Sequence, residues 1–190
     1  MLYGAYKNAR NAAWECLLDF EIDKLPVDVR EIARAAGVKV IKNADVNDLR
    51  PGESGCAYYI RKQWYIIYDD TNSAERIRFT IAHELGHIFL GHRLRRGRRA
   101  RSKEFKPKPL IEREADIFAS RLLCPSCILW GLDLHTPEEI AKACSVSYTA
   151  AKIRAERMEL LYQRSKFLTS PLEREIYENF EEFIKTKNNI

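Results

Sequence analysis

The sequence predicts an α+β fold that is mostly helical, with a small antiparallel sheet beside one central helix. Apolar residues repeat with a helical period over much of the 190 residues. Two aromatic and β-branched runs, 56–60 and 64–68, flank three polar residues, which is typical of a β-hairpin. The next predicted helix, 73–90, contains the stretch His83-Glu84-Leu85-Gly86-His87. These observations place the hairpin directly before the helix that carries the most distinctive chemistry.

The composition indicates a globular protein without a membrane segment or a disulfide framework. A chain of 190 residues is long enough for one core, or for one domain with a small appendage. No apolar run approaches the roughly 20 residues that span a bilayer, and residues 1–7 lack the apolar region of a signal peptide. The five cysteines are scattered, so the pair Cys124 and Cys127 is interpreted as packing rather than redox or zinc chemistry. We therefore expect a cytoplasmic protein.

Two helices and a strand are predicted before the hairpin. Residues 5–20 carry alanines and large apolar residues at helical spacing. A second helix is predicted over 26–36, with a proline in its first turn. Residues 38–41 form a β-branched run typical of a strand. The polar residues 42–55, rich in Asn, Asp, Pro and Gly, predict a loop.

The central helix offers two histidines and a glutamate at the spacing of a metal site. Residues four apart on a helix lie about 5–6 Å from each other on one face, so both imidazoles can reach one Zn²⁺. Glu84 lies between them and can take a proton from a water on the metal. Such residues can also be ordinary surface side chains, but this side of the helix is apolar, and buried imidazoles need partners. Gly86 leaves room for another backbone or a substrate to approach.

A strongly basic segment follows the central helix. Residues 93–108 contain nine Lys or Arg and one acid, Glu104, in a chain of net charge +5. We interpret this segment as an exposed loop with a solvated charge run, in preference to a nucleic-acid patch, because Phe105 is its only aromatic residue. Recruitment of an acidic or DNA-bound substrate stays open.

The C-terminal part is predicted to be helical, and residues 1–130 and 131–190 are predicted as two domains. A loop over 131–136 ends at Thr136-Pro137, which resembles a helix N-terminus. The two helices that follow resemble a helix-turn-helix, but the second carries acids as well as basic residues. A packing role is therefore at least as strongly favoured as DNA binding. Helices are predicted over 110–123, 140–143, 148–161 and 171–185.

A catalytic zinc usually takes three protein ligands, so a third is sought after the motif. His92 would suggest a metzincin, but that pattern needs glycine at position 90 and histidine at 93, where Leu90 and Arg93 stand. His92 is therefore rejected as that ligand, although it can line the site.

The helix over 110–123 offers Glu112 and Glu114 as ligands. Glu112 shares its face with small alanines, which allow close approach to the metal helix. Glu114 instead neighbours bulky residues and can pair with Arg121. We therefore predict Glu112 as the third ligand, and Asp116, four residues on, as the acceptor that orients a ligating histidine.

Three segments together resemble the ImmA/IrrE family of zincin-like metallopeptidases. They are 78–87 (Arg-Phe-Thr-Ile-Ala-His-Glu-Leu-Gly-His), 112–119 (Glu-Arg-Glu-Ala-Asp-Ile-Phe-Ala) and 122–125 (Leu-Leu-Cys-Pro), and the resemblance covers roughly 25–130. Asp116 stands where Asn is common, Cys124 stands where Met is common, and the basic insertion is long. The resemblance implies a zincin-like fold, Zn²⁺ and regulated cleavage of a helix-turn-helix transcriptional repressor, often in mobile elements or DNA-damage responses of bacteria.

We expect a zinc-dependent endopeptidase with His83, His87 and Glu112 as ligands and Glu84 as the base. Two alternatives stay open: a non-proteolytic regulator with a vestigial metal site that binds DNA or a repressor, and a toxin-like partner of an antitoxin repressor. An intact Glu84 argues against the first, because a structural site needs no base. The expected partner is a protein substrate and not a membrane, and the oligomeric state is left open. Candidates for the oxyanion-stabilising residue are His92, Arg121, His135 and Tyr148.

Overall fold

The computed structural model describes residues 2–92 and 109–189, with side chains from residue 8 onward. The basic segment 93–108 lies outside the described residues. The chain divides into two compact units. The described parts of 1–9 and 28–119 form the sheet unit, and those of 10–27 and 120–190 form the helical unit. The predicted domains 1–130 and 131–190 stay a prediction.

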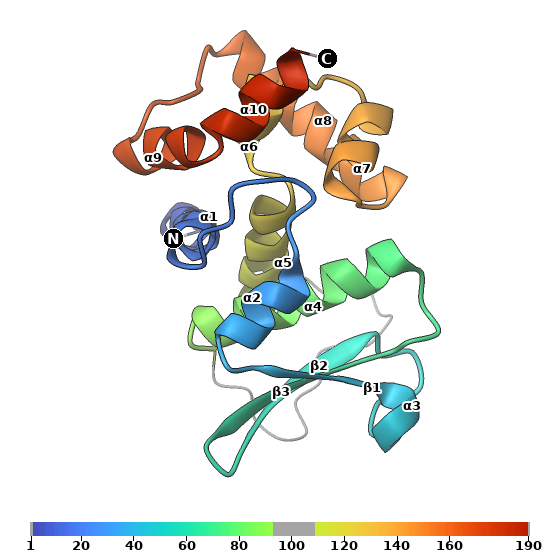
Figure 1. Cartoon of the computed structure of the whole chain (residues 1–190). Helices are drawn as coiled ribbons and strands as arrows, with labels where there is room; N and C mark the ends of the chain where they lie inside the picture. The colour runs from blue at the N-terminus through green and yellow to red at the C-terminus, as the bar shows by residue number, and fades with distance from the viewer. Residues whose placement is uncertain (1, 93–108, 190) are drawn as a thin grey trace. The chain divides into compact units, whose positions relative to one another are not determined.

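The sheet unit contains three strands, β1 (Lys39–Lys42), β2 (Gly55–Ile60) and β3 (Gln63–Tyr68), in the order β1-β3-β2 (Figure 1). The predicted hairpin is confirmed, because β2 and β3 pair antiparallel. The sheet is nevertheless mixed rather than antiparallel, because β1 pairs parallel with β3. Parallel neighbours need a long crossover, and the 20 residues that separate β1 from β3 provide it.

The hairpin turn is tighter than the sequence suggested. Arg61 and Lys62 both have positive φ, at 51° and 64°. This is the backbone of a two-residue type I′ turn, whose twist matches that of the strands. Gln63 therefore already belongs to β3, and β2 is left as an edge strand of the described sheet.

Helix α2 (Val29–Ala35) begins three residues later than predicted. The carboxylate of Asp28 accepts hydrogen bonds from the backbone N–H groups of Arg30 and Glu31, at 2.9 and 3.1 Å. Because this cap satisfies N–H groups that a helix start leaves free, the helix starts after Asp28, and the prediction that Pro26 opens it is wrong.

A short helix, α3 (Asn43–Val46), interrupts the predicted loop 42–55. The Oδ1 atom of Asn43 accepts from the backbone N–H groups of Asp48 and Leu49, both at 3.0 Å. The N–H of Ala44 donates to Oδ1 of Asp70, also at 3.0 Å. One turn of helix is too short for a hydrophobic period, so the sequence pattern did not predict it.

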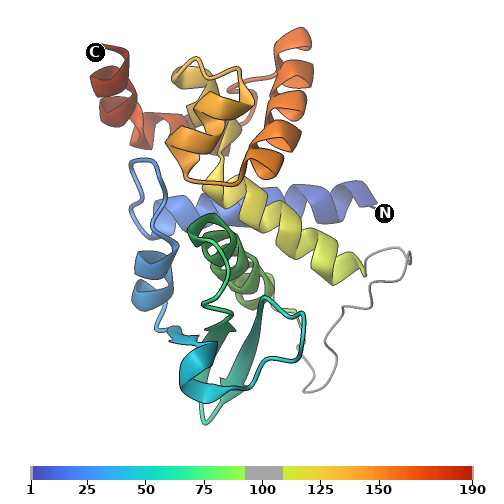
Figure 2. The same ribbon diagram turned by 90° about the vertical axis from the view of Figure 1, so that its right-hand side faces the viewer.

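Helices α4 (Ala74–Phe89) and α5 (Leu110–Leu123) follow the predicted ranges closely. Ser73 caps α4 by accepting a hydrogen bond from the N–H of Arg76 at 3.3 Å. Helix α4 lies across one face of the sheet, packed against β2 and β3 (Figures 1 and 2). Ile81 and Leu85 on this helix are fully buried, so α4 forms the core of the sheet unit and holds its motif firmly.

The helical unit contains the predicted helix pair, α7 (Pro137–Cys144) and α8 (Tyr148–Gln163), joined through residues 145–147. A capping box starts α7: Thr136 Oγ1 accepts from the N–H of Glu139, whose Oε2 accepts from the N–H of Thr136. The predicted helix 171–185 is two helices that meet at the buried Phe180. Helix α1 (Leu2–Asp19) is shared by both units, and the others are α6 (Ser126–Gly131), α7 (Pro137–Cys144), α8 (Tyr148–Gln163), α9 (Pro171–Asn179) and α10 (Glu181–Asn188).

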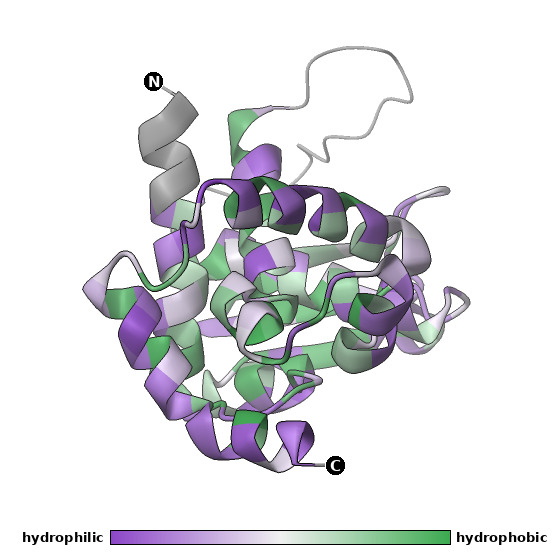
Figure 3. Cartoon of the chain, turned by 90° about the horizontal axis from the view of Figure 1, so that it is seen from above, coloured by the Kyte–Doolittle hydropathy of each residue, from purple (hydrophilic) through white to green (hydrophobic). Residues whose placement is uncertain are grey.

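Hydrophilic and hydrophobic residues alternate along the helices, as Figure 3 shows. In the part of the chain that the structure describes, no helix combines the length and the apolar character that crossing a bilayer requires.

Candidate metal centre

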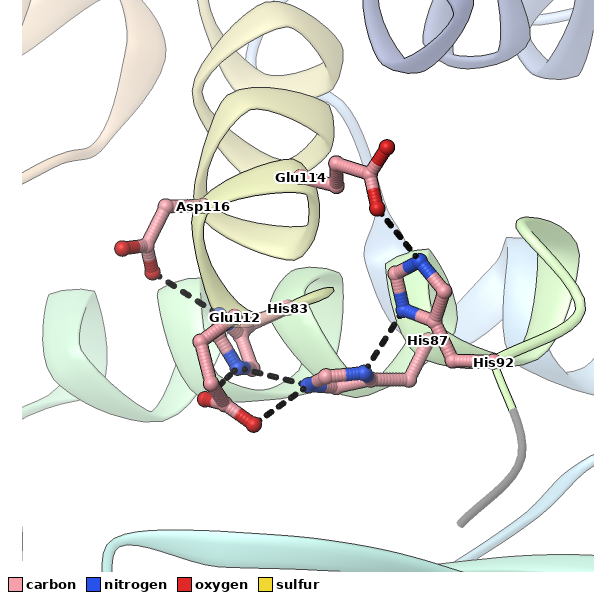
Figure 4. Close-up of polar contacts among 6 residues, drawn as sticks. All are labelled: His83, His87, His92, Glu112, Glu114 and Asp116. Atoms are coloured by element: carbon pink, nitrogen blue, oxygen red, sulfur yellow. Dashed lines mark hydrogen bonds and ion pairs between the residues drawn. The ribbon is translucent and has the colours of Figure 1, made fainter. Parts of the chain in front are cut away.

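Three side chains from two helices converge in the sheet unit: His83 and His87 of α4, and Glu112 of α5 (Figure 4). The two Nε2 atoms lie 3.1 Å apart. The carboxylate of Glu112 spans both rings, with one oxygen 3.4 Å from Nε2 of His83 and the other 3.4 Å from Nε2 of His87. All three predicted ligand residues therefore meet at one point.

The spacing of these donor atoms fits a tetrahedral metal ion. Two atoms that each lie about 2.0–2.1 Å from one tetrahedral ion are about 3.3–3.4 Å apart. The donor set of two imidazoles and one carboxylate is that of many zinc peptidases. Facing imidazole nitrogens at 3.1 Å need a proton or a cation between them, because two lone pairs repel. The residues present fit a zinc ion.

The electrostatics of the cluster also favour a cation. Burial disfavours a charged His83, but the carboxylates of Asp116 and Glu112 outweigh this effect and raise the pKa of His83 to about 9. Burial would raise the pKa of Glu112, but the two imidazoles hold it well below its ordinary value. In the absence of a metal, the cluster therefore retains a proton that a metal ion would replace.

The predicted orienting residue, Asp116, lies beside His83. Its Oδ1 atom is 3.0 Å from Nδ1 of the imidazole. The two atoms lie within ion-pair distance, and Asp116 is one of the groups that raise the pKa of His83 against the effect of burial. Glu84, the predicted base, is buried on α4, and its charge contributes to the raised pKa of His83.

The C-terminus of α4 brings a further histidine to the cluster. Gly91 has a φ of +66°, and its N–H donates to the carbonyl of Ile88 at 3.1 Å. The N–H of His92 donates to the carbonyl of His87 at 3.0 Å, which completes a Schellman motif. In this motif the residue after the glycine packs back against the last turn of the helix, and His92 therefore lies on His87.

The side chain of His92 connects His87 to a second carboxylate. Nδ1 of His92 is 2.9 Å from Nδ1 of His87, and Nε2 of His92 is 3.2 Å from Oε2 of Glu114 (Figure 4). Burial, together with the neighbouring His87, lowers the pKa of His92. Helix periodicity missed this contact because His92 lies beyond the helix. The spacing His87–Gly91–His92 of a Schellman motif would have indicated it.

One of the four candidates for an oxyanion-stabilising residue, His92, lies at the cluster, with both ring nitrogens in contact with other side chains. The other three candidates belong to the helical unit. Arg121 is buried, Tyr148 is exposed at the start of α8, and His135 stacks on Tyr162 with Nε2 2.8 Å from Oδ1 of Asp133. A role for these three stays a prediction.

Residues 33–156 match the model of the IrrE N-terminal-like domain, a peptidase family. The chain belongs to the ImmA/IrrE family. The match includes all of α4 and α5, and hence the three converging side chains. The predicted resemblance and the α+β, zincin-like fold are thereby confirmed, and the family indicates a metallopeptidase. No curated protein matches the chain.

Proposed function

We propose that this protein is a zinc-dependent endopeptidase that acts in the cytoplasm on a helix-turn-helix transcriptional repressor. The observation that carries the proposal is the convergence of His83, His87 and Glu112 within a metallopeptidase family, with Glu84 next to the first ligand. The ligand roles, the base and the metal are parts of the same proposal.

His83, His87 and Glu112 would hold the zinc ion. A bound zinc supplies Lewis acidity, which lowers the pKa of a coordinated water and polarises a carbonyl group. Two imidazoles and one carboxylate are a set of three protein ligands that a catalytic zinc ion would accept. Asp116 keeps the Nδ1 proton on His83 by its charge, so that Nε2 presents its lone pair to the metal.

Glu84 would carry the proton during hydrolysis. Its carboxylate takes a proton from the attacking water and later passes it to the nitrogen of the leaving amine. The C–O bond to the water oxygen forms first and the peptide C–N bond breaks afterwards, so the proton that Glu84 took from the water ends on the leaving amine. General acid–base catalysis of this kind contributes about 10²–10⁴-fold to the rate.

Strand β2 is a candidate for binding the substrate backbone. It pairs with β3 along one side and is an edge strand of the described sheet, and it also packs against α4. An extended peptide can add to such an edge through main-chain hydrogen bonds. The repressor as substrate, and a role in mobile elements or stress responses, follow from the family resemblance and not from this geometry.

The test is cleavage by the zinc-loaded protein, analysed by mass spectrometry. Two substrates are offered: the helix-turn-helix repressor encoded beside the gene, and a peptide library from a digested proteome. Wild type is compared with Glu84→Gln and with Glu31→Gln, whose carboxylate is exposed on α2. Cuts in either substrate by wild type and Glu31→Gln, but not by Glu84→Gln, support the peptidase.

The remaining outcomes distinguish the alternatives. Cuts in the library but not in the repressor would refute the repressor as the substrate and would still support the peptidase activity. A tight complex with the repressor, with zinc bound and neither substrate cut, would favour the non-proteolytic regulator or the toxin-like partner.

A further inference from the structure

We propose that His92 and Glu114 form a positioning relay that fixes the tautomer and orientation of His87 for metal binding. This inference rests on the proposed function, because it takes His87 to be a zinc ligand. Neither residue belongs to the three-residue metal cluster. Their role is to act through His87, not to contact the metal or the substrate.

The contacts form one continuous chain from α5 to the metal cluster (Figure 4). Oε2 of Glu114 lies 3.2 Å from Nε2 of His92, and Nδ1 of His92 lies 2.9 Å from Nδ1 of His87. The opposite nitrogen of His87, Nε2, is the atom that faces His83 and Glu112. Each ring therefore uses both nitrogens, and the metal-facing nitrogen lies at the end of the chain.

The direction of the hydrogen bonds follows from the carboxylate. The carboxylate oxygen of Glu114 accepts, so Nε2 of His92 donates to it across 3.2 Å. Nδ1 of His92 then carries no proton and accepts the Nδ1–H of His87. Nε2 of His87 is consequently left with its lone pair directed at the metal position. The relay thus selects, from the two neutral tautomers of His87, the one that can bind a metal.

The backbone turn at Gly91 and the burial of the side chains of His92 and Glu114 hold the relay in this arrangement. The Schellman motif at Gly91 ties the N–H of His92 to the carbonyl of His87, so the same pair is joined through both backbone and side chain. The side chains of His92 and Glu114 are 8% and 18% exposed. Water therefore has little access to replace these contacts, and the ring of His87 depends on them for its orientation.

His83, the other proposed histidine ligand, is supported differently from His87. Asp116 contacts His83 directly, but its side chain is 34% exposed. The relay behind His87 is longer and more buried. Both zinc-binding histidines are thus supported by carboxylates of α5, two residues apart, with Glu112 between the rings as a ligand.

Zinc affinity tests the relay independently of peptide cleavage. It is measured by competition with a fluorescent chelator for wild type, His92→Ala, Glu114→Ala and Glu114→Gln, with Glu31→Gln as the matched surface control. We expect His92→Ala and Glu114→Ala to lower zinc affinity about 10–100-fold, the usual effect of losing such a partner. Glu114→Gln keeps a carbonyl oxygen that accepts from His92, so it should retain much of the affinity. Equal affinities in wild type and both alanine variants would overturn the relay.

The tautomers supply a second readout that a merely structural role would not move. Long-range ¹H–¹⁵N spectra of the intact wild-type protein should show His87 protonated at Nδ1 and His92 protonated at Nε2. Glu114→Ala should shift His92 toward the other tautomer. If His92→Ala fails to fold, the wild-type spectra still decide, because a proton on Nδ1 of His92 would overturn the relay.

The experiments distinguish an error in the relay from an error in the proposed peptidase function. A wild-type protein that binds zinc and cuts nothing would refute the peptidase and leave the relay standing if its tautomers are as described. A wild-type protein that cuts peptides, with unchanged zinc affinity in the relay variants, would refute the relay alone.

Discussion

Oε2 of Glu112 lies 3.4 Å from Nε2 of His83, although the two residues come from different helices. The approach of these helices is limited where Gly86 meets Phe118. A β-carbon added at Gly86 would lie 3.0–3.2 Å from three atoms of the Phe118 side chain. The missing side chain at Gly86 therefore leaves room for Phe118 on the helix that also carries Glu112.

A side chain at position 86 tests the contact between Gly86 and Phe118. Gly86→Val should lower the free energy of unfolding by about 1–3 kcal/mol, because its side chain overpacks against Phe118. It should also weaken zinc binding by moving Glu112 away from the histidines. Chemical denaturation and chelator competition measure the two effects. Ala74→Val, at the exposed start of the same helix, is the control and should change neither quantity appreciably. Wild-type zinc affinity in Gly86→Val would contradict the spacing argument.

Glu84→Gln should retain zinc and lose cleavage. The amide keeps the size of the side chain but cannot take a proton from water, so we expect the rate to fall by about 10²–10⁴-fold. Zinc stoichiometry by mass spectrometry under native conditions is measured beside the cleavage rate. A variant that cleaves at the wild-type rate would show that another residue is the base.

Removal of a ligand should differ from Glu84→Gln, because zinc binding should be lost together with cleavage. His83→Ala and Glu112→Ala each remove one of the three converging donors, so both zinc binding and cleavage should be lost. Zinc should raise the melting temperature of wild type, because it binds the folded state, and should leave that of the two variants nearly unchanged. Thermal unfolding with and without a chelator checks this. Stoichiometric zinc in Glu112→Ala would contradict its assignment as a ligand.

The metal-free protein should lose stability as the pH rises from about 6.5 to 9. The folded state raises the pKa of His83 from 6.5 to about 9, so it binds this proton more tightly than the unfolded chain does. The resulting stabilisation is complete below 6.5 and disappears as the pH approaches 9. Urea unfolding at a series of pH values measures it, and His83→Gln should remove the decline. A flat profile for wild type over this range would contradict the raised pKa.

Much of the site could be predicted because it depends on local spacing. His83 and His87 are one helical turn apart, and Glu112 shares a face of α5 with Ala115 and Ala119, both fully buried. The caps at Ser73 and Thr136 likewise follow from a few neighbouring residues. Such features need no knowledge of distant parts of the chain.

The features that sequence did not predict are long-range or very short. The parallel pairing of Val40 with Ile66 joins strands that are far apart in the chain, and no local pattern specifies it. The break at Phe180, whose ring is fully buried, interrupts a helical period that continues on both sides. The contact of His92 with Glu114 requires both the turn at Gly91 and the return of α5 beside it.

Substitutions at Gly91 test the turn that ends α4. Its φ of +66° lies in the left-handed region, which costs a residue with a β-carbon about 1–2 kcal/mol, although Asn adopts it more readily. The site around a β-carbon at Gly91 is open, so the effect of a substitution there is conformational rather than steric. Gly91→Val should therefore destabilise the protein more than Gly91→Asn does.

Because this turn holds the backbone of His92 against His87, zinc affinity should fall in the same order. Stability is measured by denaturation and zinc affinity by chelator competition, each for wild type, Gly91→Val and Gly91→Asn. If Gly91→Val loses stability but binds zinc as tightly as Gly91→Asn, the C-terminal turn of α4 stabilises the helix without positioning His92 for the metal centre.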